Sequence, residues 1–358
     1  MISKRILFTI FFLITLLLVQ AGVASAEGLP NVHILATGGT IAGRGGTTTQ
    51  TTGYAAGVIG VETLIEAVPE MKKYANISGE QFCNIASNQI NYEIWLKLAK
   101  RVNELLESPQ VDGVVITHGT DTLEETAYFL NLVVKSEKPV VLVGSMRPAT
   151  AISADGPGNL LNAVRLAGSP QAHKKGVLIA MNDQILNARD ATKTNTTHVE
   201  TFKAPELGYL GYLQNGRPYF YRETTRKHTV MTEFDVKDMK SLPYVGIIYG
   251  HVGNEISVRA VVDALVASGV KGIVYAGTGH GSIKPISLEA LVDAQKKGVV
   301  VVRTSRVGNG IVTQWDRYAK ANIIAGDTLN PQKAAILLTV ALTETNDLAT
   351  IQRIFDEY

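Results

Sequence analysis

The 358-residue chain contains one cysteine, Cys83, and lacks any block rich in lysine and arginine. A single cysteine excludes an intramolecular disulfide. It lies in EQFCNIA, an alternating stretch that predicts a half-buried strand, and because no histidine lies nearby in sequence a structural thiol is favoured over a catalytic one. The 34 Lys and Arg residues nearly balance the 32 Asp and Glu residues. This balance argues against a protein that binds nucleic acid.

The motifs of common cofactor sites are also missing. The seven histidines form neither an HExxH motif nor another close metal-ligand spacing, and no Gly-x-Ser-x-Gly elbow occurs. The glycines of GTGHGS, which begins at Gly277, lack the spacing of a dinucleotide-binding loop. No Gly-Lys-Ser or Gly-Lys-Thr marks a phosphate-binding loop. The sequence predicts neither a metal nor a cofactor.

The first 26 residues have the pattern of an export signal. Lys4 and Arg5 form a basic start, residues 6–19 form an apolar run, and Ala24-Ser25-Ala26 offers a small-residue cleavage site. The run is short for a membrane span, and no stop-transfer pattern follows. We expect cleavage after Ala26 and a periplasmic or secreted protein without a membrane contact. An uncleaved N-terminal anchor is the alternative.

Short apolar runs alternate with amphipathic segments along most of the remaining chain. The expected strands are 32–36, 113–117, 140–144, 177–181, 245–249, 272–276 and 299–303. The expected helices are 61–68, 95–105, 158–168, 257–268, one from Ser287, one over 332–343 and a last amphipathic one, with Asn330 as the N-cap before Pro331. Apolar strands that alternate with helices indicate parallel sheets covered on both faces, and so an α/β fold.

The alternation pauses between about residues 207 and 240. There NGRPYFYRETTRKHTVMTEF is aromatic and alternating, which is typical of antiparallel hairpins. We therefore expect two α/β domains, the larger first. The predicted bounds are 27–215 for the N-terminal domain, 216–240 for a hairpin and linker, and 241–358 for the C-terminal domain.

Polar residues crowd the end of the expected strand 113–117, in VVITHGTDTLEET. Thr122 and Glu125 fit a capping box, so a helix is expected to start there. In an open parallel sheet, ligands bind outside the carboxyl ends of the strands. The helix start favours a carboxylate, and Asp121 could hold an ammonium, a combination that suits an amino acid. The alternative is that Asp121 and Thr122 only cap the helix.

The first expected strand ends in the same way, in VHILATGGTIAG. Its two glycines permit close backbone approach and could aim two N–H groups at one oxygen, as an oxyanion site needs. Thr40 could then be the attacking hydroxyl. A threonine nucleophile needs a base, and Lys193 in RDATKTNTT is the candidate, since a desolvated lysine can lose its proton near neutral pH. The alternative is a solvated surface lysine.

After Thr40 comes GRGGTTTQTTGYAAG, a Gly- and Thr-rich loop that carries Tyr54. Its position between a strand end and a helix is typical of a mobile lid. A surface linker is the alternative that this composition leaves open.

Two stretches, ILATGGTIAG and VVITHGTDTLEETAYFL, resemble the two signature motifs of bacterial L-asparaginases and lie about eighty residues apart. GSMRP, SADGPGNLLNA, MND, RDATKTNTT and LNPQKA resemble further stretches of that family in the same order, and the likeness extends from about Leu29 to Tyr358. With the export signal, the resemblance points to the periplasmic type II group. It implies a homotetramer of two-domain subunits with a flavodoxin-like N-terminal domain and active sites between neighbouring subunits. It also implies hydrolysis of L-asparagine to L-aspartate and ammonia without a cofactor.

The resemblance assigns catalytic roles by motif. Thr40 would attack the side-chain amide and form an acyl-enzyme, assisted by Tyr54. Thr120, Asp121 and Lys193 would form a second polar cluster that activates the nucleophile or the water. We expect Thr40 to attack first, although the sequence leaves that order open.

The resemblance also assigns substrate contacts. Ser87, Asp121 and the backbone around Gly119-Thr120 would bind the α-carboxylate and α-amino groups. Asn88 stands where the family usually carries Gln or Glu, which makes the extent of glutaminase activity an open question.

Two residues would reach the site from a neighbouring subunit. Asn254 is the expected asparagine, although the alignment there needs a gap. The acidic residue of the family has no clean counterpart, and Asp316 is nearest. The rival interpretations are a solute-binding protein that captures an amino acid without turnover, and a glutaminase-asparaginase with similar rates on both amides.

Overall fold

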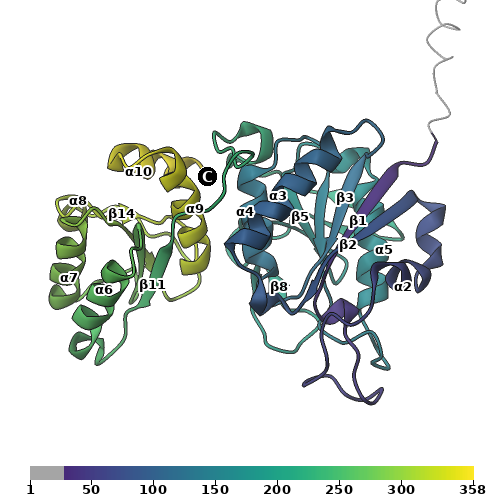
Figure 1. The fold of residues 1–358 in the computed structure, drawn as a ribbon, viewed down its shortest axis with the longest axis horizontal. Helices are drawn as coiled ribbons and strands as arrows, with labels where there is room; N and C mark the ends of the chain where they lie inside the picture. Colours follow the sequence, from purple (N-terminus) through teal and green to yellow (C-terminus); the bar gives the residue numbers. More distant parts are fainter. Residues whose placement is uncertain (1–27) are drawn as a thin grey trace, which may run out of the picture.

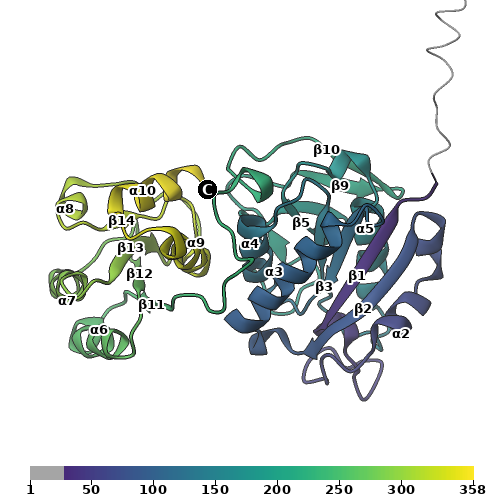
Figure 2. The ribbon, with the colours of Figure 1, turned by 45° about the horizontal axis from the view of Figure 1, so that its top comes forward.

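The computed structural model describes residues 28–358, and the expected export signal lies outside the described residues. Figures 1 and 2 show two α/β bodies side by side, joined by an extended segment. Among the helices of residues 28–358, none combines the length and the apolar character that crossing a membrane requires.

The larger body is built on an eight-stranded sheet with the order β10-β9-β6-β5-β4-β3-β1-β2. The strands β2-β1-β3-β4-β5 are parallel, and this order is that of flavodoxin-like sheets. Antiparallel pairing adds β6, β9 and β10 at the other edge. The bounds are β1 Asn31–Gly38, β2 Asn76–Ile85, β3 Gly113–Thr117, β4 Val140–Val143, β5 Val177–Met181, β6 Gln184–Asn187, β9 Gly211–Gln214 and β10 Arg217–Phe220.

Helices cover both faces of this sheet. In β1, Leu35 packs into the core beneath α3 and α4, whereas its neighbours Val32 and Ile34 pack into the core beneath α2 and α5. Alternate residues of the strand therefore face opposite layers, as the apolar runs predict. The helix bounds are α2 Val61–Glu66, α3 Tyr92–Glu107, α4 Leu123–Val133 and α5 Gly156–Ala167.

The smaller body has a parallel four-stranded sheet in the order β11-β12-β13-β14. Tyr275 of β12 packs with α6 and α7, and Val274 packs in the core that contains α9 and α10. The strands are β11 Val245–Tyr249, β12 Gly272–Gly277, β13 Val300–Ser305 and β14 Ile324–Ala325. The helices are α6 Val258–Ala267, α7 Pro285–Gln295, α8 Asp316–Ala319, α9 Pro331–Glu344 and α10 Leu348–Glu357.

The aromatic stretch after residue 207 forms a single hairpin, β9-β10, which belongs to the first sheet. Between β10 and β11 the regular structure is one short 3-10 turn, Thr229–Met231, so this segment acts as the connection between the bodies. The two bodies also share a hydrophobic core, in which Tyr128 of α4 belongs to the same cluster as Leu337 and Leu338 of α9.

The two predicted helix starts have different outcomes. Asn330 caps α9 as expected, since its side-chain oxygen accepts a hydrogen bond from the Lys333 amide at 3.0 Å. The prediction of a capping box at the start of α4 is wrong. Thr122 occupies the N-cap position, but its hydroxyl donates to the Ser87 carbonyl at 2.8 Å and makes no cap bond. The chain segment that follows β2 offers a competing acceptor that local sequence does not reveal.

Candidate active site

The carboxyl ends of β1 and β3 lie side by side in the middle of the parallel strands. The chain leaves β1 toward α2 on one face and leaves β3 toward α4 on the other, so this is the topological switch point of the sheet. Thr40 follows β1, and Thr120 with Asp121 follows β3. Both polar stretches singled out in the sequence therefore meet at the place where open α/β sheets bind ligands.

The turn after β1 differs from the expected oxyanion site. The N–H of Gly39 donates to the Ile85 carbonyl of β2 at 3.0 Å, so it is not free to bind a ligand oxygen. The expectation that both glycines aim N–H groups at one oxygen is wrong for Gly39. Its φ of 79° instead lets the chain turn sharply into a 3-10 turn, Thr40–Ala42.

The first hydroxyl cluster joins Thr40 and Tyr54. Thr40 is buried, and its Oγ1 lies 2.8 Å from the Tyr54 hydroxyl, which comes from the Gly- and Thr-rich loop. Burial raises the pKa of Tyr54, opposed by the hydrogen bond to Thr40 and reinforced by the charges of Asp121 and Asp155. Tyr54 therefore keeps its proton near neutral pH and can exchange a hydrogen bond with the threonine.

The second cluster joins Lys193, Thr120 and Asp121. The Lys193 Nζ lies 2.6 Å from Asp121 Oδ1 and 3.0 Å from Thr120 Oγ1. The Lys193 side chain is 17% exposed, so the surface interpretation of this lysine is wrong. As an ammonium it donates to both oxygens, and as an amine it could accept the proton of the Thr120 hydroxyl over the same contact.

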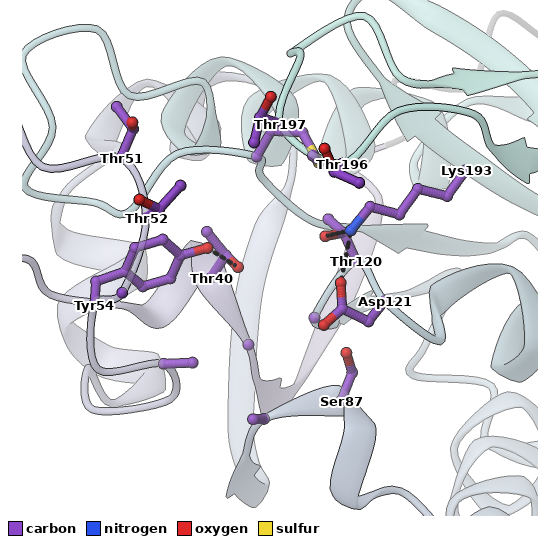
Figure 3. Close-up of a pocket in the computed structure, with 16 residues that line it drawn as sticks. Thr40, Thr51, Thr52, Tyr54, Ser87, Thr120, Asp121, Lys193, Thr196 and Thr197 are labelled. Atoms are coloured by element: carbon purple, nitrogen blue, oxygen red, sulfur yellow. Dashed lines mark hydrogen bonds and ion pairs between the residues drawn. The ribbon is translucent and has the colours of Figure 1, made fainter.

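Figure 3 shows the two clusters facing each other across one cavity, with Ser87 below Asp121. The cavity has a volume of about 290 Å³, which suits a small molecule such as an amino acid. Hydroxyl side chains dominate the lining. It consists of Gly39, Thr40, Thr51, Thr52, Gly53, Tyr54, Ala56, Ala86, Ser87, Gly119, Thr120, Asp121, Met146, Lys193, Thr196 and Thr197.

The loop that carries Tyr54 is folded against the site. The Gln50 side chain accepts from Gly46 N–H at 2.6 Å and donates to the carbonyls of Thr52 and Gly53. The N–H of Gly57 donates to the Gly39 carbonyl at 2.9 Å. This segment is therefore an organised wall of the cavity rather than a surface linker.

Three expected residues lie away from this cavity. Asn88 follows Ser87 in a 3-10 turn, Ser87–Gln89, but it is exposed and does not line the cavity. Asn254 lies in the smaller body, where its Nδ2 donates to the Tyr275 hydroxyl at 3.0 Å; its buried Oδ1 has no partner within residues 28–358. Asp316 is exposed at the start of α8.

His118 does not line the cavity, but it contacts the Gly119 peptide that does, and the sequence did not assign it. The Trp95 indole N–H donates to Thr126 Oγ1, the Thr126 hydroxyl donates to His118 Nε2, and His118 Nδ1–H donates to the Gly119 carbonyl at 2.7 Å. Trp95 can only donate and a carbonyl can only accept, so this chain defines the tautomer. Burial lowers the pKa of His118 to about 4, although the hydrogen bond to the Gly119 carbonyl acts to raise this pKa. His118 is thus a neutral support for the Gly119 peptide.

Thr196 and Thr197 also line the cavity without having been predicted. Their loop is closed by hydrogen bonds from the Thr197 and His198 amides to Asn195 Oδ1, both at 2.9 Å. The sequence signal for this turn is the Asn that precedes the two threonines, because Asn side chains close such turns on the backbone.

Cys83 does not line this cavity. Cys83 lies in β2, as predicted, and burial raises its thiol pKa to about 11. Its Sγ lies 3.4 Å from the Thr37 carbonyl. Within residues 28–358, no three His, Cys, Asp or Glu side chains are arranged to hold a metal ion.

Fold and site together define a two-domain α/β protein with a small cavity between two threonine clusters at a sheet switch point. The chain belongs to the asparaginase family. Residues 31–226 match the domain family described as "Asparaginase, N-terminal", and residues 244–355 match "Glutaminase/Asparaginase C-terminal domain".

Similar proteins cover nearly the whole chain. L-asparaginase 2 of Bacillus subtilis is 57% identical over 95% of this chain and 89% of its own length. The probable periplasmic L-asparaginase of Haemophilus influenzae is 51% identical over 97% and 98%. The glutaminase-asparaginase of Pseudomonas fluorescens is 50% identical over 92% and 91%. A crystal structure of a probable cytoplasmic L-asparaginase from Campylobacter jejuni, 50% identical, superposes with a TM-score of 0.89 over 92% of this chain and all of that one.

Proposed function

We propose that this protein hydrolyses the side-chain amide of L-asparagine to give L-aspartate and ammonia. The observation that carries the proposal is the pair of hydroxyl clusters, Thr40 with Tyr54 and Thr120 with Lys193 and Asp121, on opposite walls of one small cavity. The printed names of the relatives, L-asparaginase and glutaminase-asparaginase, support it.

The charged ends of the substrate match the floor of the cavity. Asp121 is 67% exposed at its side chain and has an oxygen beyond the one that Lys193 contacts, so it can accept from the α-ammonium. The buried Ser87 hydroxyl and the backbone at Gly119 offer donors for the α-carboxylate. These contacts would point the side-chain amide toward the threonines.

The reaction then proceeds in two steps. Thr40 Oγ1 attacks the amide carbon and passes its proton to the Tyr54 hydroxyl, which passes its own proton on to the leaving nitrogen, so that the C–N bond breaks and ammonia departs. A water molecule next attacks the threonine ester, which releases L-aspartate and restores the hydroxyl. Lys193, as an amine, accepts a proton through Thr120 and so activates the nucleophile or this water.

The proposed assembly is a homotetramer with sites completed by neighbouring subunits. β11 is an edge strand, and apolar side chains are exposed along it and beyond its carboxyl end, including Tyr249, Val252 and Ile256. Such an apolar edge is typical of a protein contact. The unpartnered Asn254 Oδ1 lies in the same region. Sedimentation tests the assembly, and a monomer with full activity would contradict it.

The proposed destination is the periplasm or the exterior, after cleavage behind Ala26. The relative from Haemophilus influenzae carries the word periplasmic in its name, which supports export. N-terminal sequencing of the protein recovered outside the cytoplasm tests it, because the first residue would be Glu27.

Steady-state hydrolysis of asparagine and glutamine by purified protein tests the activity. Ammonia release from asparagine is the expected result. Saturable binding of asparagine without ammonia would favour the solute-binding alternative, and similar kcat/KM values on both amides would favour a glutaminase-asparaginase.

A further inference from the structure

Lys193 sits on a strand that is only two residues long. β7 Thr192–Lys193 pairs with β8 Phe202–Lys203, apart from the two main sheets. The position of its amine relative to Thr120 and Asp121 therefore depends on what else holds the backbone. The Lys193 amide donates to Glu124 Oε2 at 2.5 Å, and Glu124, in the first turn of α4, is 3% exposed.

The other oxygen of Glu124 is held by the C-terminal domain. Glu124 Oε1 accepts from Asn330 Nδ2 at 3.0 Å and from Gln332 Nε2 at 2.8 Å, at the start of α9. A buried carboxylate requires such partners, because an unsatisfied charge in the interior is costly. One carboxylate thus connects the backbone of Lys193 to a helix about 140 residues later in the chain.

Lys333, in the first turn of α9, holds the segment that leads into β7. It is 2% exposed, and its Nζ donates to the Arg189 carbonyl at 2.7 Å and to the Ala191 carbonyl. Burial lowers the pKa of its ammonium to about 8. The same α9 turn therefore restrains the Lys193 strand both through Glu124 and through the preceding carbonyls.

We propose that Glu124, Gln332 and Lys333 are positioning residues that set the place of the Lys193 amine, so that the C-terminal domain tunes the active site of its own subunit. The inference rests on the proposed function. None of the three lines the cavity, so they act through the backbone of Lys193 rather than on the substrate. Misplacement of a catalytic group by about 1 Å can cost on the order of a hundredfold in rate.

Docking of the two domains has other supports. The Nη2 atoms of Arg189 and Arg226 each lie 2.8 Å from Asp327 Oδ2, and the core shared by α4 and α9 is independent of the Glu124 bonds. Loss of one positioning contact should therefore leave the domains assembled while the amine moves. A variant that loses activity while its domains stay assembled therefore reveals a positioning role rather than a general contribution to the domain interface.

The experiment compares Lys333→Met and Gln332→Ala with Lys138→Met in the full-length mature protein. Lys138 is a matched control, because its Nζ also donates to backbone carbonyls, at 2.7, 2.8 and 2.9 Å, but far from Lys193. We expect kcat on asparagine to fall about tenfold or more in the two α9 variants while KM stays within about threefold. The control should lose thermal stability to a similar extent and keep its kcat within about twofold.

A second measurement places the effect on Lys193. In a Lys193→Met background, Gln332→Ala should lower kcat no further, because the amine that it positions is gone. Additive losses there, or α9 variants that match the control in kcat, would overturn the inference. Absence of ammonia release by the unaltered protein would instead refute the proposed function, so the two failures are distinguishable.

Discussion

The backbones of Gly39 and Gly119 touch at the tips of β1 and β3. A Cβ on Gly39 would lie 2.3 Å from both the nitrogen and the Cα of Gly119, distances that real Cβ atoms do not adopt. The contact brings the turn that carries Thr40 against the turn that carries Thr120. The two hydroxyl clusters can share one small cavity because neither glycine has a side chain.

Gly39→Ala should abolish activity and destabilise the protein by several kcal/mol, at least about 2, since both the clash and the positive φ oppose a side chain. Gly158→Ala is the control, because a Cβ at Gly158 in α5 meets no atom within 4 Å. That variant should keep full activity and gain about 0.5–1 kcal/mol from helix propensity. Urea unfolding and ammonia release measure both effects, and an active Gly39→Ala protein would contradict the close contact.

Thr40→Ala should abolish turnover and leave aspartate binding within about tenfold, because the hydroxyl acts mainly in the transition state. Thr40→Ser is the control that retains a hydroxyl and should keep measurable activity. Calorimetric titration with aspartate and ammonia release are the measurements. Retained turnover in Thr40→Ala would indicate that Thr120, rather than Thr40, is the nucleophile.

Lys193→Met should lower kcat by several orders of magnitude, about a thousandfold or more, with the fold intact. Lys203→Met on the neighbouring strand is the control, because Lys203 pairs with Glu200 on the surface and is 42% exposed at its side chain. The control should have a normal rate. A near-normal rate for Lys193→Met would show that its contacts with Thr120 and Asp121 are structural.

His118 should make stability depend on pH. Its pKa of about 4 in the folded protein lies below the ordinary value of 6.5, so between these pH values the unfolded chain binds a proton that the folded protein does not. The free energy of unfolding should therefore fall by roughly 3 kcal/mol as pH drops from about 6.5 to 4, and this part of the loss should vanish in His118→Gln. Urea unfolding across this range measures it. An NMR titration of His118 with an ordinary pKa would contradict the prediction.

Asn88→Gln should raise kcat/KM on glutamine relative to asparagine, because the resemblance to L-asparaginases implies a longer side chain at this position. Asn88 is exposed and directly follows the buried Ser87, which lines the cavity, so a side chain one methylene longer could reach the cavity from this position. The ratio of the two kcat/KM values is the measurement. An unchanged ratio would remove this position from specificity.

Local sequence predicted the secondary structure well where a short apolar run is bounded by turn residues. β3, β5 and β11 have the predicted bounds, whereas α5 begins two residues earlier, at Gly156. Thr122 shows the limit of this reasoning, since its hydroxyl is taken by the carbonyl of Ser87, 35 residues away. A hydrogen-bond partner distant in sequence therefore determined that the Thr122 side chain does not cap α4.

For the active site too, local motifs indicated some of the residues and missed those whose partners are distant in sequence. The motifs indicated Thr40, Tyr54, Thr120, Asp121 and Lys193, and all of them line one cavity. His118 and Glu124 were missed, because a lone buried histidine or glutamate has no local pattern. Their partners, such as Asn330 for Glu124, come from elsewhere in the chain.

By itself, the sequence determined the alternation of strands and helices and the polar residues at two strand ends, because apolar periodicity and turn residues act over a few neighbours. Only the tertiary structure decided the geometry: the Lys193 Nζ lies 3.0 Å from Oγ1 of Thr120, 73 residues away in sequence, and α9 holds the Lys193 backbone through Glu124. Such contacts depend on how sheets and helices pack around a common core, and no local pattern encodes that geometry.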